Sequence, residues 1–183
     1  MFQSVLICSS LMVAVIGFSV VGPEISECIN NAGPLPLAAR VTGCTGTPCV
    51  LPQLEDVPID IIFRAVHTTV SMSTTATAFF SFGTMQLPIP FELSEKSVTC
   101  NYLINSTCPV KTGSILLYTL DFFVDPVFPI GSGTTIEFTV WGDHQDAMMC
   151  FRVPLTVQSP LPLIMQRKSS KVKLSSNNRT NGI

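Results

Sequence analysis

Six cysteines follow an uncharged, apolar N-terminal segment, and their spacing constrains this chain more than any other feature. They form two close pairs, with one cysteine well before the pairs and one well after them: Cys28, Cys44, Cys49, Cys100, Cys108 and Cys150. An even number of cysteines behind a secretory leader is typical of a disulfide framework. The layout indicates two local crosslinks and one long one, although spacing alone cannot select among the many pairings that six cysteines allow.

The N-terminal segment has the character of a secretory signal peptide. Its stretch 5–21 carries no charge, and Gly17 and Ser19 place small residues three positions and one position before a cut after Ser19. We therefore expect a signal peptide over 1–19, which would also remove Cys8. A basic residue before the apolar stretch is missing, so an uncleaved membrane anchor is the alternative.

The remaining chain divides into an acidic domain and a basic tail. With 46% apolar and 12% charged residues in the chain, 20–158 is predicted to be one domain with its own core. All twelve acidic residues but only five of the ten basic ones precede residue 159, which gives 20–158 a net charge of minus seven. The tail 159–183 combines five basic residues with Ser and Asn, so we expect it to be disordered. Attraction to an anionic membrane surface or to the protein's own acidic face is the alternative for the tail. We expect no nucleic-acid partner.

Apolar residues recur at every second position, which predicts an all-β fold. In 57–66, Val57, Ile59, Ile61 and Phe63 fall on one face of a strand. Four further strands are expected, at 75–84, 114–124, 134–141 and 147–157, the last two joined as a hairpin by the turn 142–146. Two antiparallel sheets packed face to face would bury the apolar rows, as in an immunoglobulin-like sandwich.

Other motifs indicate surface chemistry rather than catalysis. Asn105 and Asn178 begin Asn-Ser-Thr and Asn-Arg-Thr glycosylation sequons. His67 and His144 have no accompanying Gly-x-Ser-x-Gly motif or phosphate-binding loop, so we expect no enzymatic activity and no cofactor. No Cys-x-x-Cys pair and no EF-hand spacing is present, so we also expect no metal.

The order of several short motifs resembles a known family, the ML lipid-recognition domain. These motifs are Gly-Cys-Thr-Gly-Thr-Pro-Cys at 43–49, Leu-Pro-Ile-Pro-Phe at 87–91, Cys-Pro-Val-Lys-Thr-Gly at 108–113 and Cys-Phe-Arg-Val-Pro at 150–154. The resemblance covers about 27–158 and is greatest to Niemann-Pick type C secreted cholesterol-transfer proteins and mite-allergen-like homologues. It implies three disulfides: Cys28 with Cys150, Cys44 with Cys49, and Cys100 with Cys108. We expect the protein to be a monomer.

The resemblance also implies an apolar ligand cavity between the two sheets. By position it places Phe91, Val127 and Phe128 at the cavity entrance. Phe128 stands where the sterol binders have a tyrosine, which leaves fatty acids open as ligands beside sterols. Strand alternation assigns the deeper lining to Ile59, Ile61, Phe63, Phe80, Phe82, Tyr118, Phe138, Val140, Phe151 and Val153.

We therefore expect a secreted lipid-binding and transfer protein that holds a sterol, a fatty acid or another small lipid. Its further partners would be a lipid-accepting membrane receptor or an anionic membrane surface. Asp60 occupies the position of a glycosylated asparagine in the lysosomal relative, which favours an extracellular over a lysosomal location. The competing hypotheses are an immune co-receptor for microbial lipids and an adhesion sandwich without a ligand.

Overall fold

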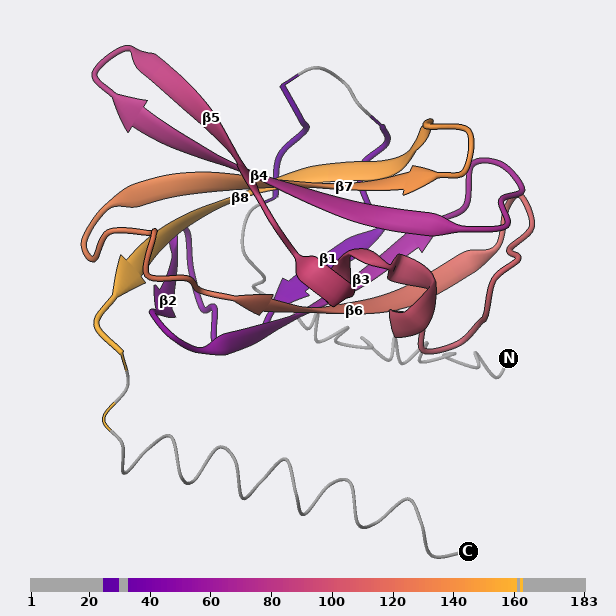
Figure 1. Cartoon of the computed structure of the whole chain (residues 1–183), viewed down its shortest axis with the longest axis horizontal. Coiled ribbons are helices and arrows are strands. Elements are labelled where there is room, and N and C mark those ends of the chain that lie inside the picture. The colour runs from indigo at the N-terminus through magenta and orange to yellow at the C-terminus, as the bar shows by residue number, and fades with distance from the viewer. Residues whose placement is uncertain (1–24, 30–32, 161, 163–183) are drawn as a thin grey trace, which may run out of the picture.

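Two β-sheets face each other in a sandwich (Figure 1). The computed structural model describes residues 25–29, 33–160 and 162; the predicted signal peptide, most of the tail and Asn178 lie outside them. In the described residues the smaller sheet has the order β1 (Ala38–Val41), β3 (Asp56–Arg64) and β6 (Ile115–Phe123). The larger sheet has the order β2 (Cys49–Pro52), β8 (Ala147–Gln158), β7 (Gly133–Gly142), β4 (Met72–Phe82) and β5 (Met85–Phe91). Two 3-10 turns, η1 (Ser94–Ser97) and η2 (Thr99–Tyr102), follow β5.

The predicted sandwich and its five predicted strands are confirmed, as β3, β4, β6, β7 and β8. The structure adds β1 and β2, four residues each, which are too short to show a period. It also adds β5, which contains Pro88 and Pro90 and, within the part of the chain that the structure describes, pairs only with β4. Proline has no backbone N–H to donate to a neighbouring strand, so within sheets it is found mainly in edge strands such as this one. The larger sheet is mixed, because β2 runs parallel to β8.

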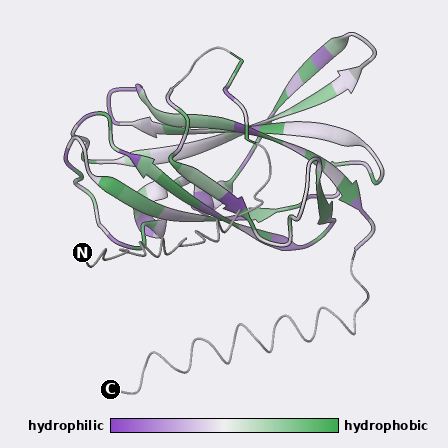
Figure 2. Ribbon diagram, turned by 180° about the vertical axis from the view of Figure 1, so that it is seen from behind, coloured by the Kyte–Doolittle hydropathy of each residue, from purple (hydrophilic) through white to green (hydrophobic). Residues whose placement is uncertain are grey.

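The core lies between the sheets and consists of every second residue of the long strands. In β3, Val57, Ile59, Ile61 and Phe63 are buried, as their alternation predicts. Figure 2 shows the corresponding succession of apolar and polar segments along the strands. No helical segment within the described residues has the length and apolar character needed to cross a membrane.

The three predicted disulfides are present. Cys28 and Cys150 are 122 residues apart in sequence, and their Cα atoms are 6.0 Å apart. This bond fixes the N-terminal segment against β8, where Ser26 and Arg152 also exchange two backbone hydrogen bonds of 3.1 and 2.9 Å. The pairs Cys44–Cys49 and Cys100–Cys108 close loops between residues only 5 and 8 positions apart.

Asn105 supports the edge strand β6 as well as opening a sequon. Its Nδ2 donates to the carbonyl oxygen of Ile115 (3.0 Å), and its Oδ1 accepts from the backbone N–H of Leu117 (2.9 Å). The side chain therefore replaces part of a missing neighbouring strand. The side chain is exposed, and its glycosylation stays a prediction.

Replacing Asn105 by alanine should lower the free energy of unfolding by about 1–2 kcal/mol, because two hydrogen bonds are lost. Thr107→Ala removes the same sequon but keeps the amide, so it should leave stability within about 0.5 kcal/mol. Urea unfolding of proteins produced in a host that does not N-glycosylate measures both, so that the Asn105 amide is unmodified in the wild type and in Thr107→Ala. Equal losses in the two variants would show that the hydrogen bonds contribute nothing.

Candidate functional site

The three residues predicted at the entrance line one hollow of about 250 Å³. It lies between β4, β5 and the β6–β7 connection, and we call it the entrance hollow. Its walls are Ala78, Phe80, Ile89, Pro90, Phe91, Glu92, Asp125, Val127 and Phe128. Val127 is 56% exposed, whereas Phe128 is fully buried. The sequence motifs at 87–91 and 126–129, far apart in the chain, therefore meet at one place.

A continuous row of aromatic rings leads from this hollow into the core. The ring centre of Phe91 lies 5.3 Å from that of Phe128 and 5.4 Å from that of Phe122. The ring of Phe138 follows 5.5 Å from Phe122, and the ring of Phe151 follows 5.5 Å from Phe138. We call these five rings the aromatic row. Such contacts at 4.5–7 Å are favourable for aromatic pairs, so the row holds the two sheets together.

Phe122 is the member of this row that sequence reasoning missed. The adjacent pair Phe122 and Phe123 leaves the inward side ambiguous, since one of two neighbours must face out. The spacing of Phe122 from Tyr118 and Leu120, in steps of two, is the signal that could have identified it. In the structure Phe122 is buried and Phe123 is exposed.

The other predicted lining residues face the interior from both sheets, and their role with a ligand stays a prediction. Phe80 is half-buried and stacks near Phe128, with ring centres 6.0 Å apart. The side chain of Phe82 is outside the described part of the structure. The remaining members are buried: Ile59, Ile61, Phe63, Tyr118, Val140 and Val153.

Tyr118 provides a polar group inside this apolar interior. Its hydroxyl forms a hydrogen bond of 2.9 Å with Thr74 Oγ1, which lies 2.8 Å from Thr99 Oγ1. All three side chains are buried. Removal from water raises the pKa of Tyr118 to about 12, against the lowering effect of the two threonine hydroxyls.

The pKa of Tyr118 predicts a loss of stability in alkali. The pKa of about 12 in the folded protein exceeds the ordinary value of 10.0. The contribution of neutral Tyr118 to the free energy of unfolding is therefore complete below pH 10 and is lost as pH rises toward 12. The loss should be about 2–3 kcal/mol, because one pKa unit corresponds to about 1.4 kcal/mol. Urea unfolding across this pH range should show the fall in the wild type and a shallower one in Tyr118→Phe. Parallel curves for the two proteins would contradict the prediction.

Two acidic residues, Glu92 and Asp125, line the entrance hollow and also a second hollow of about 350 Å³ beside it. We call the second one the acidic groove; Glu92, Glu95, Asp121 and Asp125 line it together with Lys96 and Phe123. Lys96 Nζ lies 2.7 Å from Asp56 Oδ1, so its charge is directed to a carboxylate outside the groove. Among the described residues, no basic side chain lies within ion-pair distance of Glu92, Glu95 or Asp121.

His144 lies in the β7–β8 turn and His67 in the β3–β4 connection, at the other end of the sandwich from the β6–β7 connection (Figure 1). His67 Nε2 is 2.8 Å from Asp146 Oδ2, and His144 Nε2 is 3.7 Å from Asp143 Oδ1. Hydrogen bonds from the N–H of Val70 and the hydroxyl of Thr69 hold the pKa of Asp143 below its usual value. These contacts fix a turn and are remote from the entrance hollow.

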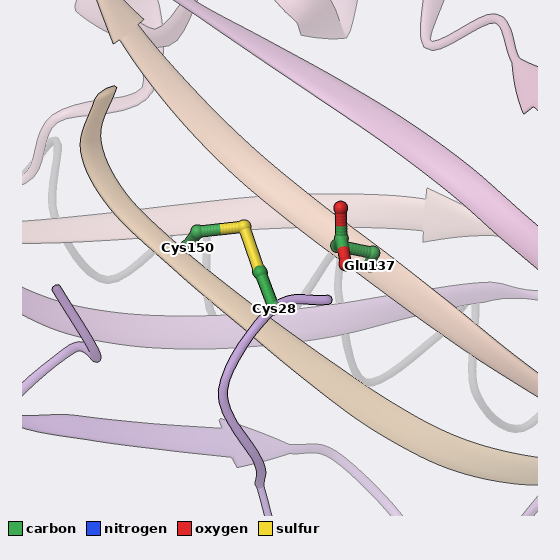
Figure 3. A group of neighbouring side chains, drawn as sticks. All are labelled: Cys28, Glu137 and Cys150. Carbon is green, nitrogen blue, oxygen red and sulfur yellow. A yellow bond between two sulfur atoms is a disulfide. The ribbon is translucent and has the colours of Figure 1, made fainter. Parts of the chain in front are cut away.

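One further cluster combines Glu137 with Cys28 and Cys150 (Figure 3). Its two sulfur atoms are joined to each other, so neither is available as a thiolate ligand. The carboxylate of Glu137 accepts the backbone N–H of Ile29 at 3.2 Å and lies 3.8 Å from Arg152 Nε. The cluster is therefore part of the disulfide's surroundings rather than a metal centre.

Comparison with known proteins agrees with this geometry. The family model of the ML domain matches residues 23–157. No curated protein matches the sequence. The crystal structure of a Niemann-Pick type C2 protein from the Japanese carpenter ant is similar, with a TM-score of 0.56 and 16% identity over 74% of this chain and 99% of that one. At this identity the likeness concerns the fold.

Proposed function

The chain belongs to the ML domain family, and from this membership we propose that it is a secreted protein that binds one small lipid between its sheets and transfers it. The observation that carries the proposal is the entrance hollow, whose apolar walls lead directly onto the aromatic row. Its three disulfides support an oxidising, extracellular location. The protein would deliver its lipid to a membrane or to a membrane receptor.

A lipid would have to enlarge the entrance hollow. Its volume of about 250 Å³ lies below the roughly 300–1,000 Å³ of ligand pockets. Phe91 is the wall best able to move, because it lies on β5, whose only strand partner in the described structure is β4. Burial of roughly 400 Å² of apolar lipid surface would contribute about 10 kcal/mol before the costs of binding and opening.

The charges at the entrance favour a lipid with an uncharged polar end. Glu92 and Asp125 line both the entrance hollow and the acidic groove, so a carboxylate held there would meet like charges. A hydroxyl group meets no such repulsion. We therefore infer a preference for a sterol or a long-chain alcohol over an ionised fatty acid.

A matched alcohol and fatty acid of equal chain length test both the binding and the preference. Each is titrated at neutral pH against a fluorescent sterol bound to the full chain. The alcohol should bind about fivefold more tightly, since like charges near a surface cost on the order of 1 kcal/mol. Glu92→Gln should narrow the difference between the two affinities. Glu27→Gln should leave that difference unchanged, because Glu27 is exposed in the N-terminal segment and lines neither hollow.

The possible results separate the hypotheses. Tighter binding of the fatty acid would contradict the charge argument while leaving lipid binding intact. Failure of the sterol, the alcohol and the acid to bind the folded protein would contradict the proposed function and favour a sandwich without a ligand.

A further inference from the structure

The outer face of the smaller sheet carries a continuous apolar stripe. The stripe runs across the strands, because Ala38 of β1 is paired with Ile62 of β3, and Ile62 is paired with Leu117 of β6. Ile104, in the segment after η2, donates its backbone N–H to the carbonyl of Leu117 at 2.8 Å and extends the stripe beyond β6. Ile104 is 67% exposed, and all four residues line a hollow over this face. We call these four residues the outer stripe.

The charges of β3 are arranged symmetrically about the outer stripe. On the same face, Asp60 lies two residues before Ile62 and Arg64 lies two residues after it. Asp60 accepts from Arg40 and from a threonine hydroxyl, each at 2.9 Å, and Arg64 donates to the carbonyl of Gly113 at 3.1 Å. A carboxylate has about four acceptor sites and a guanidinium has five donors, so these contacts leave both groups with further capacity. Strand β3 therefore presents a negative, an apolar and a positive position in succession.

This succession is complementary to itself. Asp60 and Arg64 both lie about 7 Å along the strand from Ile62. When a second copy faces the first across a two-fold axis that follows the outer stripe, Ile62 lies over the partner's Ile62. Asp60 then lies over the partner's Arg64, and Arg64 lies over the partner's Asp60. From this complementarity we propose that the outer face of the smaller sheet binds a second copy of this chain, as two-fold dimers use one patch on both subunits.

The surroundings of the outer stripe permit such a contact. Among the strands that the structure describes, none packs on this face (Figure 1). Sheets packed face to face lie about 10 Å apart, a gap that an aspartate and an arginine side chain bridge together. The net charge of minus seven on 20–158 opposes association of two copies. Beside the outer stripe this repulsion is absent, because Arg40 and Arg64 there outnumber Asp60.

The size of the face predicts a weak, reversible dimer in place of the expected monomer. Four neighbouring segments about 4.8 Å apart, with nine residues of about 3.3 Å each, give a footprint of at most roughly 600 Å² per copy. This area is at the lower end of specific protein interfaces, where complexes are often transient. The outer stripe shares no residue with the entrance hollow, so the inference does not rest on the proposed function.

Sedimentation velocity of the full chain, from micromolar to near-millimolar concentration, tests the dimer. The wild type should pass from monomer to dimer in this range. Asp60→Lys and Arg64→Asp should each raise the dissociation constant at least about tenfold, because each places like charges opposite each other twice. Glu27→Lys is the control, since it changes the net charge as Asp60→Lys does but lies beside Ser26, which is bonded to β8 of the larger sheet. It should dimerise like the wild type.

An equimolar mixture of Asp60→Lys and Arg64→Asp is the most specific test. In the mixed dimer the introduced lysine faces the introduced aspartate, and the native arginine faces the native aspartate. The mixture should therefore form a heterodimer although each variant alone is a monomer. A mixture that stays monomeric while the wild type dimerises would overturn the proposed face. If Asp60→Lys does not fold, Arg64→Asp alone decides, and wild-type dimerisation in that variant would also overturn it.

Glycosylation is controlled through Asn105, which follows Ile104 at the end of the outer stripe. If the secreted wild type is a monomer, the same concentration series is run on Thr107→Ala, whose Asn105 cannot be glycosylated. A dimer of this variant alone supports the proposed face and shows that a glycan blocks it. Monomers of both proteins at every concentration would contradict the proposal. Sterol uptake is measured on the same samples, so that a loss of lipid binding and a loss of the dimer are recorded separately.

Discussion

Replacement of both Cys28 and Cys150 by serine should lower the free energy of unfolding by about 5 kcal/mol. The two cysteines are 122 residues apart in sequence, so their bond excludes a large share of the conformations of the unfolded chain. The chain-entropy relation gives about 5 kcal/mol for a loop of this length. Since domains of this size are stable by roughly 5–15 kcal/mol, the variant should lie close to unfolding at body temperature.

The local disulfides provide the matched control. Cys100→Ser/Cys108→Ser opens a separation of only 8 residues and should cost about 2.5 kcal/mol by the same relation. Urea unfolding under non-reducing conditions compares the two double variants with the wild type. A loss in the Cys100/Cys108 variant that equals or exceeds the loss in the Cys28/Cys150 variant would contradict the assignment of the dominant crosslink.

Phe122→Ala should lower the free energy of unfolding of the lipid-free protein by about 3–5 kcal/mol, as expected for removal of a buried aromatic side chain. Phe122 is 1% exposed, and its ring contacts those of Phe91, Phe128 and Phe138. The space that it leaves would be continuous with the entrance hollow. A lipid that enters there can fill part of this space, so adding lipid should stabilise the variant by more than it stabilises the wild type.

Leu116→Ala distinguishes this effect from ordinary core damage. Leu116 is fully buried on the same face of β6 but near the start of the strand, whereas Phe122 is near its end. Leu116→Ala should lower the free energy of unfolding by about 2–5 kcal/mol. Adding lipid should raise that free energy by the same amount as in the wild type. Unfolding with and without a saturating sterol measures these gains. Equal gains in all three proteins would show that lipid does not reach the aromatic row.

Much of the fold was predictable because long strands with one buried face carry a period-two signal. β3 is the clearest case, with Ile59 and Ile61 buried and Asp60 between them half-buried. The edge strand β5 gave no such signal, because Pro88 and Pro90 argue against a strand and most of its residues are exposed. The four-residue strands β1 and β2 are defined by their pairing partners rather than by their own sequences.

The candidate site was predictable only in part, since it depends on contacts between distant segments. Family resemblance, not periodicity, placed Phe91 and Phe128 at one entrance and selected the disulfide pairs. The acidic groove could not be read from the chain, because Glu92 and Glu95 follow β5 while Asp121 belongs to β6. The position of Gln158, at the end of β8, could not be read from the chain either. The hydrogen bonds of Gln53 to Gln158 and Phe128 place it beside the entrance hollow.

Native mass spectrometry of the secreted, non-reduced protein tests the central claim of lipid binding most directly. Lipid released from the same sample by organic extraction identifies the ligand. We expect a folded chain with three disulfides that carries one small lipid with an uncharged polar end, or takes one up when sterol or long-chain alcohol is supplied. A folded, fully oxidised protein that is empty and stays empty with every sterol, alcohol and fatty acid offered would contradict it.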